Sequence, residues 1–261
     1  MNGFDLTGCS VLITGASAGI GREFARQLAG RAGSLVLVAR RLDRLEELRD
    51  ELTKKDPNLN VHCRAVDLSQ AREVEELCQW LNRERIAIDF LINNAGLGDR
   101  GTFATAEPDL VRQILAVNIV ALTTLTRALL PAMLAKKHGA ILNVSSIAGF
   151  LPIRKFAVYA ASKAYVTSFS EGIRAEVRKQ GVVVTALCPG PVDTEFNSVA
   201  ARGSRERHPP SPSFMHMPVE DVVRAGLAGI ERNKPLVVPG IVMKIAMFLV
   251  RLTPMAILRR V

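Results

Sequence analysis

The sequence is poor in the residues that build disulfide frameworks, metal sites and nucleic-acid stacking surfaces. Its 261 positions contain four cysteines, one tryptophan and only 5% aromatic residues. Cys9, Cys63, Cys78 and Cys188 lie far apart, without C-x-x-C spacing and without a matching histidine cluster. We therefore predict neither a disulfide framework nor a metal site, and a reducing, cytoplasmic compartment suits this cysteine usage.

The first residues lack the basic segment and the long apolar run of a signal peptide, because only Val11 to Ile13 is continuously apolar there. Zinc-finger spacing and RNP-like aromatic motifs are also missing, so the net charge of +9 does not by itself predict nucleic-acid binding. The excess is concentrated near the end of the chain, where residues 201–261 hold ten basic and four acidic residues. A basic soluble surface is the preferred interpretation.

Short apolar runs alternate with charged amphipathic stretches along most of the chain. The helical stretches include Arg41–Lys55 and Ala71–Arg83. Continuous apolar runs are typical of parallel strands covered on both faces. The alternation predicts an α/β fold with a doubly wound parallel sheet, in one domain spanning residues 1–261. The predicted strands are Ser10–Ile13, Leu35–Ala39, Val61–Val66, Phe90–Ile92, Ala140–Val144, Val182–Leu187 and Leu236–Val238.

Two segments depart from this rhythm. Residues 195–217 carry the cluster HPPSPS and little periodicity, which indicates a loop. The tail, residues 241–261, is apolar and basic but too short and interrupted to span a membrane. A helix over Ile241–Leu252 would carry only Lys244 and Arg251 as charges, on one stripe. Such a helix could pack over the substrate loop or at a subunit interface, or it could lie in a membrane interface.

A glycine-rich turn follows the first predicted strand and precedes a helical pattern. Its sequence, TGASAGIG, lets the backbone turn tightly and approach a pyrophosphate at a helix N-terminus. The same residues spell G-x-S-x-G from Gly15 to Gly19, the nucleophile elbow of serine hydrolases. That alternative would need Asp193 with His208 or His216 as partners. It would also place the serine after the first strand, with no earlier oxyanion motif.

A tyrosine and a lysine lie one helical turn apart, at Tyr159 and Lys163. An unperturbed phenol has a pKa of about 10, too high for a base at neutral pH. A cation about 4 Å away would lower that pKa by roughly 3 units before desolvation is counted. The pair therefore predicts an acid/base with a pKa near 7.

These motifs together resemble the classical short-chain dehydrogenase/reductase family over nearly the whole chain. The turn TGASAGIG, the segment Asn93-Asn94-Ala95-Gly96, Asn118, Ser145-Ser146, Tyr159-x-x-x-Lys163 and Cys188-Pro189-Gly190 occur in the family's order and spacing. The resemblance implies a Rossmann-type sheet of about seven strands with helices on both faces, and a homodimer or homotetramer. Small residues at Ala160, Ala164 and Ser168 would permit close helix packing.

The resemblance implies a role for each matching residue. Tyr159 would exchange a proton with the substrate oxygen, Ser146 would hydrogen-bond that oxygen, and Lys163 would hold the nicotinamide ribose. Asn118 would anchor a water chain to Lys163, unless it is simply a satisfied core amide. The cofactor contacts it implies are Gly15, Ser17, Ala18, Gly19, Ile20, Gly21, Asp67, Leu68, Asn93, Ala95, Gly96, Tyr159, Lys163, Pro189, Gly190, Val192 and Thr194.

The second strand predicts which cofactor is used. NAD-specific sites end this strand with an acid that binds the ribose 2′-hydroxyl, whereas this chain has Arg40 and Arg41. Because arginine pairs with a 2′-phosphate, we predict NADP(H), with Arg40 the principal contact. Two observations leave room for other interpretations: both arginines could be the solvated start of a helix, and Ala18 stands where many NADP-using relatives carry Lys or Arg. The Asp67-Leu68 pair could likewise be a helix N-cap.

The residues implied for the substrate side are Ser146, Leu97, Phe150, Arg154 and Phe156, together with the 195–217 segment. They suit an apolar carbonyl or alcohol compound with a polar end. The predicted function is NADP(H)-dependent hydride transfer, with no nucleic-acid partner and possible peripheral membrane contact through 241–261. The alternative from another class is a catalytically idle NADPH-binding regulator on the same fold.

Overall fold

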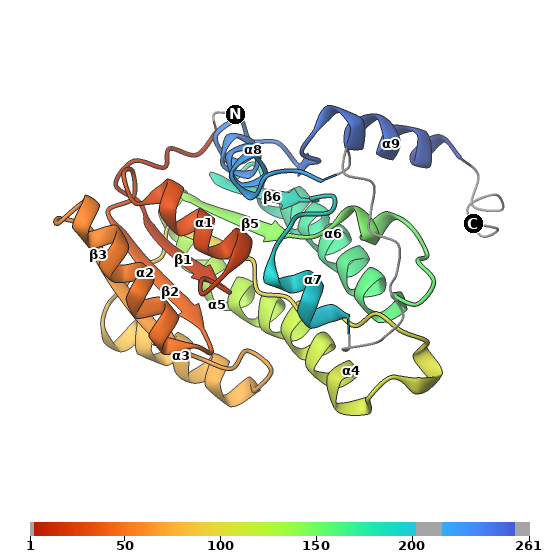
Figure 1. The fold of residues 1–261 in the computed structure, drawn as a ribbon. Helices are drawn as coiled ribbons and strands as arrows, with labels where there is room; N and C mark the ends of the chain where they lie inside the picture. Colours follow the sequence, from red (N-terminus) through yellow and green to blue (C-terminus); the bar gives the residue numbers. More distant parts are fainter. Residues whose placement is uncertain (1–2, 202–215, 254–261) are drawn as a thin grey trace.

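A computed structural model describes residues 3–201 and 216–253. Its centre is a seven-stranded parallel sheet in the order β3-β2-β1-β4-β5-β6-β7 (Figure 1). The strands are β1 Ser10–Thr14, β2 Ser34–Ala39, β3 Asn60–Ala65, β4 Phe90–Asn93, β5 Gly139–Val144, β6 Val182–Leu187 and β7 Leu236–Val237. This confirms the predicted doubly wound fold, and each predicted strand lies within one residue of its observed bounds.

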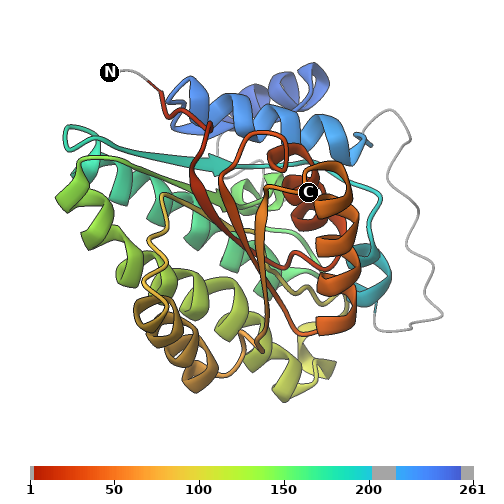
Figure 2. The same cartoon turned by 90° about the vertical axis from the view of Figure 1, so that its left-hand side faces the viewer.

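The helices lie in two layers, one on each face of the sheet (Figure 2). One layer contains α1 Gly19–Leu28, α2 Leu42–Lys55 and α8 Val219–Glu231. The other contains α3 Ala71–Arg83, α5 Leu122–Lys136 and α6 Ala157–Val177, with α4 Pro108–Leu115 joined to α5 through a π-helical segment, η2 Ala116–Ala121. The short elements are η1 Phe103–Thr105, η3 Ile147–Phe150 and α7 Glu195–Ala200, and α9 Ile241–Leu252 follows β7.

Strand side chains alternate between the two layers because the side-chain period of a strand is two residues. Val11 and Ile13 pack with α1 and α2, whereas Leu12 between them packs with α3 and α5. The same division separates Phe90 and Ile92 from Leu91. Both faces of the sheet are therefore core, which explains why the sequence shows continuous apolar runs rather than alternating ones.

The strand order reverses between β1 and β4. From β1 the chain adds β2 and β3 on one side of the sheet, and it then crosses to the other side of β1 to add β4. The register pairs Val11 with Leu35 on one side and with Phe90 on the other. In doubly wound sheets a crevice opens at the carboxyl ends of the two strands at this switch point. The glycine-rich turn follows β1 and the Asn94–Gly96 segment follows β4, so both border this crevice.

One prediction about a loop needs correction. Residues 195–217 were expected to form a loop, but Glu195–Ala200 is the helix α7, which begins after the extended residue Thr194. Residues 202–215 lie outside the described residues. The tail prediction of a helix over Ile241–Leu252 is confirmed as α9.

Candidate active site

One large cavity, of about 960 Å³, lies at the carboxyl end of the sheet. Its walls come from the turn after β1, the ends of β2 and β3, the segment after β4, η3, α6 and the Pro189–Asn197 segment. Most of the predicted site residues line it. They are Gly15, Ser17, Ala18, Gly19, Ile20, Arg40, Arg41, Asp67, Leu68, Ala95, Gly96, Leu97, Ser146, Phe156, Tyr159, Lys163, Pro189, Gly190, Val192 and Thr194.

The glycine-rich turn has no room for a side chain at Gly15 or Gly21. Gly15 has a φ of +68°, a conformation that favours glycine, and a Cβ at Gly21 would lie 2.3 Å from the Gly15 carbonyl oxygen. The Asn94 side chain fixes the turn from β4, because its Nδ2 donates to the Thr14 carbonyl oxygen at 2.8 Å. The N-terminus of α1 thus faces a cavity with a close-packed glycine floor, an arrangement that suits a bound phosphate group.

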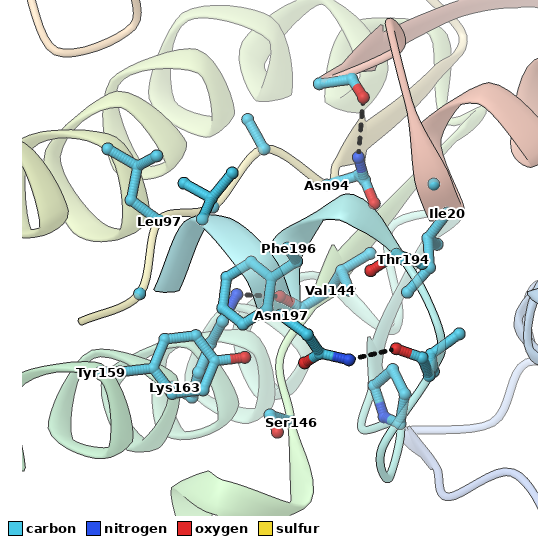
Figure 3. A pocket seen from close by; sticks show the side chains of 18 of the residues that line it. Ile20, Asn94, Leu97, Val144, Ser146, Tyr159, Lys163, Thr194, Phe196 and Asn197 are labelled. Atoms are coloured by element: carbon cyan, nitrogen blue, oxygen red, sulfur yellow. Dashed lines mark hydrogen bonds between the residues drawn. The ribbon is translucent and has the colours of Figure 1, made fainter. Parts of the chain in front are cut away.

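Tyr159 is 8% exposed and lies between two aromatic rings in the first turn of α6 (Figure 3). Its ring stacks on Phe156 at a centroid distance of 4.3 Å and contacts Phe196 of α7 at 5.3 Å. Ser146, at the end of the β5 segment, lies near the phenol hydroxyl. The two hydroxyl groups therefore face the same part of the cavity, where both can reach one substrate oxygen.

Lys163 lies behind Tyr159 and is 4% exposed. Its Nζ donates to the Val144 carbonyl oxygen at 2.8 Å and lies 5.6 Å from the centre of the Tyr159 ring. A Cβ at Gly96 would come within 3.3 Å of this Nζ and 3.5 Å of Asn118 Oδ1. The glycine therefore gives Lys163 the space it occupies beside the cavity wall.

Burial controls the titration of both groups. Desolvation raises the pKa of Tyr159 to about 12, while Ser146 and the more distant Arg100 charge act to lower it. Desolvation also lowers the pKa of Lys163 to about 8. The expectation that Lys163 brings the Tyr159 pKa near 7 is not met in the chain alone. Because both groups are buried, the charged form of each is penalised before either can stabilise the other.

Asn118 is buried on the π-helical segment η2, and both the oxygen and the nitrogen of its side-chain amide form hydrogen bonds. Its Oδ1 accepts from the Leu97 N–H at 2.8 Å, and its Nδ2 donates to the Leu97 carbonyl and the Ser162 hydroxyl, both at 2.9 Å. The amide thus holds the segment after β4 against α6. The polar partner required in this apolar stretch is present, and a water relay to Lys163 stays a prediction.

Two predicted contacts are corrected by their positions. Asn93 was predicted to contact the cofactor, but its side chain is buried inside the fold, where Nδ2 donates to Thr126 and Asn143. Phe150 was predicted to contact the substrate, but it packs with Met243 and Met247 of α9. Neither Asn93 nor Phe150 is among the residues that line the cavity.

The end of β2 presents a cluster of arginines. Arg40 and Arg41 line the cavity, and Arg41 Nη2 lies 3.4 Å from the Ser17 hydroxyl. Glu195, on α7, pairs with Arg41 at 3.1 Å and with Arg44 at 2.6 Å. These hydrogen bonds lower the pKa of the Glu195 carboxyl. Sequence reasoning missed Arg44 and Glu195, because their pairing joins residues about 150 positions apart.

The serine hydrolase alternative requires a serine, a histidine and an aspartate in contact, and within residues 3–201 and 216–253 the structure shows only the contact between histidine and aspartate. His216 Nδ1 lies 2.8 Å from Asp193 Oδ1, but His216 Nε2 is buried without a hydrogen-bond partner. Ser17 interacts with Arg41 rather than with a histidine. The serine–histidine contact that a hydrolase requires is therefore missing among the described residues. His208, the other histidine nominated, lies outside them.

Comparisons with known proteins show which family the chain resembles. The family model described as short chain dehydrogenase matches residues 10–204. A sulfoacetaldehyde reductase from Chromohalobacter salexigens is 38% identical over 210 residues, which cover 77% of this chain and 78% of that protein. A dehydrogenase/reductase SDR family protein 7-like from Anopheles gambiae is 35% identical over 206 residues, 78% of this chain.

Among solved structures, a short-chain dehydrogenase from Sphingobium yanoikuyae in complex with NADPH superposes with a TM-score of 0.83 at 32% identity. The superposition covers 93% of this chain and 92% of that chain. The matches to the Anopheles gambiae protein and to a dehydrogenase/reductase SDR family member 7B from Bos taurus span 65% and 62% of those proteins' lengths.

Proposed function

The chain belongs to the short-chain dehydrogenase family, and on this premise we propose that it is an NADP(H)-dependent oxidoreductase acting on carbonyl and alcohol groups. The observation that carries the proposal is the meeting of Ser146, Tyr159 and Lys163 at one cavity that also contains the glycine turn. An idle cofactor-binding regulator would have no need for this set of three side chains. Membership of an oxidoreductase family and the presence of all three of these side chains together support catalysis rather than regulation.

The cavity residues fit a dinucleotide cofactor. Gly15 and Gly19 line the cavity beside the N-terminus of α1, which supports pyrophosphate binding there, and Asp67 and Leu68 line the same cavity, where they would contact the adenine. Arg40 is exposed at the cavity edge and available to a 2′-phosphate. The relative with NADPH bound supports the same choice. When bound, the reduced nicotinamide supplies the hydride.

The chain's own residues would handle the proton. Ser146 would hold the substrate carbonyl oxygen, and Tyr159 Oη would donate the proton that converts it to a hydroxyl. The raised pKa of Tyr159 keeps the phenol protonated at neutral pH, which is the state that carbonyl reduction requires. Lys163 would hold the nicotinamide ribose and Asn118 would support the segment that carries Leu97.

The testing experiment is a panel of aldehydes, ketones and fatty-acyl carbonyl compounds, each followed by loss of NADPH absorbance. We expect reduction of at least one class with NADPH and a much lower rate with NADH at the same concentration. Absence of NADPH consumption with every compound, despite measurable NADPH binding, would favour the regulator instead. Detection of ester hydrolysis without cofactor would revive the hydrolase alternative.

We also propose that the protein is a cytoplasmic homo-oligomer that binds membranes peripherally through α9. Met243 and Met247 hold α9 on the fold, each 5% exposed, while its opposite face is apolar and open to solvent. Figure 1 shows α9 extending along one edge of the molecule. The exposed residues of this face are Ile241, Val242, Ile245, Phe248, Leu249 and Leu252, with exposures of 45–71%.

An anionic lipid surface is the partner that this face fits best. The chain from Ile241 onward contains Lys244, Arg251, Arg259 and Arg260 but no acidic residue, so its charge complements anionic headgroups. Full-length protein should therefore float with vesicles of phosphatidylcholine and phosphatidylglycerol, and less with phosphatidylcholine alone. Phe248→Ser should reduce flotation, whereas Phe103→Ser, at an equally exposed site on η1, should not.

The vesicle experiment also has an outcome that overturns this proposal. If Phe248→Ser leaves flotation unchanged but dissociates an oligomer in light scattering, the α9 face is an interface between copies of the chain. Neither substitution lies in the cavity, so the activity of both variants on a water-soluble carbonyl should equal that of the wild type.

The long helical run Pro108–Lys136 is apolar enough to span a membrane by composition, but Leu125 and Met133 pack it into the core.

A further inference from the structure

A half-buried arginine, Arg100, lines the cavity beside the proposed catalytic residues. It lies on the loop that follows β4, which two backbone hydrogen bonds fix in place. Its own N–H donates to the Ala200 carbonyl at the end of α7, and the N–H of Gly101 donates to the Lys155 carbonyl, both at 2.8 Å. The loop is therefore tied to both segments that border the substrate side of the cavity.

The Arg100 guanidinium lies on the aromatic cluster that holds the proton donor. Its central carbon is 5.0 Å from the centre of the Phe156 ring, which in turn stacks on Tyr159. Its charge acts to lower the pKa of Tyr159. The guanidinium of Arg100 therefore lies on the Phe156 side of the cavity, beside Tyr159. Arg40 lies at the end of a different strand, β2.

Arg100 is the half-buried arginine of this cavity, whereas Arg40, Arg41 and Arg154 are exposed. Glu195 pairs with Arg41, whereas no ion pair or hydrogen bond joins the Arg100 guanidinium to another of the described residues. A partly buried charge without a partner is costly, and such groups are normally paired. Stacking on Phe156 offsets only part of that cost.

Several apolar side chains share this cavity with Arg100, and two exposed cations, Arg154 and Lys155, also line it. Leu97, Leu151, Ile153, Phe156, Phe196 and Val199 line the same cavity. The planar guanidinium forms two parallel hydrogen bonds with a carboxylate, a geometry that an ammonium group does not provide. We propose that Arg100 binds a carboxylate on the substrate, so that the substrates are oxo acids, or the matching hydroxy acids, with an apolar stretch between the two groups.

This inference rests on the proposed carbonyl chemistry, and matched substrates test it. Succinic semialdehyde and laevulinate are compared with their methyl esters, which replace the negative charge by a methyl group. In the wild type, kcat/KM should favour each acid by about 10- to 150-fold, the usual effect of a charge-assisted hydrogen bond. Arg100→Gln should abolish this preference, mainly through a higher KM for the acids, and should lower kcat/KM much more for the acids than for their esters.

Arg154 provides the matched control, because it also lines the cavity but is exposed. Arg154→Gln should retain the preference for acids. Loss of the preference in Arg154→Gln but not in Arg100→Gln would overturn the assignment, as would a wild type that reduces esters and acids equally well.

A binding measurement separates this proposal from the proposed function. Hexanoate and hexanamide, which have no reactive carbonyl, are titrated calorimetrically into the protein with NADP⁺ present. Tighter binding of hexanoate in the wild type and equal binding in Arg100→Gln would support the carboxylate site even if no carbonyl compound were reduced. Equal binding of both compounds to the wild type would overturn it, whatever the enzymatic activity.

Discussion

The ammonium group of Lys163 lies 5.6 Å from the centre of the Tyr159 ring and donates its hydrogen bond to the Val144 carbonyl. The two groups that we propose act together in proton transfer are thus both buried, and each is less easily charged than in water. Burial of a charged Lys163 therefore lowers the free energy of unfolding, and the size of this effect depends on pH.

Lys163→Met should reveal that dependence. The pKa of Lys163 is about 8 in the fold and 10.5 as an ordinary side chain, so the unfolded chain binds more protons between these values. Wild-type stability should then rise, relative to the variant, as pH increases from about 7 to 10, by at most about 3 kcal/mol. Thermal unfolding of both proteins across this range measures the difference. A wild-type free energy of unfolding that stays constant or falls relative to that of the variant over this pH range would contradict the lowered pKa.

Glu195→Gln should strengthen NADPH binding. The substitution frees Arg41 and Arg44 from a carboxylate that competes with a 2′-phosphate. Because both pairs are exposed, the gain should be at most about fivefold and should disappear at high salt. Fluorescence titration with NADPH and NADH measures it. Glu51→Gln, which breaks a pair with Arg26 outside the cavity, should change neither affinity, and weaker NADPH binding in Glu195→Gln would contradict the competition.

Arg40→Ala should weaken NADPH binding by about 10- to 150-fold and leave NADH nearly unchanged, because only NADPH carries the 2′-phosphate. Arg41 stands beside it, so the double variant should lose more. Arg49→Ala on α2, outside the cavity, is the control. Equal affinity of the wild type for both cofactors would show that the NADP assignment is wrong.

Gly21→Ala should destabilise the fold and weaken cofactor binding together. The added Cβ would lie 2.3 Å from the Gly15 carbonyl oxygen, so the turn must open. Overpacking of this kind typically costs about 1–3 kcal/mol. Gly30→Ala meets nothing within 4 Å and should leave both properties unchanged. Denaturant unfolding and NADPH titration test the pair, and a fully stable Gly21→Ala protein with normal affinity would exclude a tight glycine floor.

The sheet was predictable because parallel strands covered on both faces leave continuous apolar runs such as Val182–Leu187, whose bounds match the structure. The cavity position followed from the turn after β1. Side-chain directions were less accessible. Asn93 turns into the core because Thr126 and Asn143 satisfy its amide there, and Phe150 turns toward α9, an element about 90 residues later.

The pKa values of buried groups and the contacts between distant residues were the features hardest to predict from the sequence. Tyr159 and Lys163 are one helical turn apart in any α-helix, but their pKa values depend on the depth of burial, which the spacing does not encode. Arg100 belongs to no sequence motif, and it reaches the site through backbone hydrogen bonds to Ala200 and from Gly101 to Lys155, and through stacking on Phe156. The exposed face of α9 was suggested by its apolar sequence, but which of its residues pack inward required the fold.

The most direct measurement is single-turnover NADPH oxidation by Tyr159→Phe with the best carbonyl compound of the panel. Because the substitution removes one hydroxyl and keeps both ring contacts, unfolding temperature and NADPH affinity should match the wild type. The rate of hydride transfer should fall by about 10²- to 10⁴-fold, the usual contribution of a positioned acid. A variant that binds NADPH normally and still turns over at close to the wild-type rate would contradict Tyr159 as the proton donor.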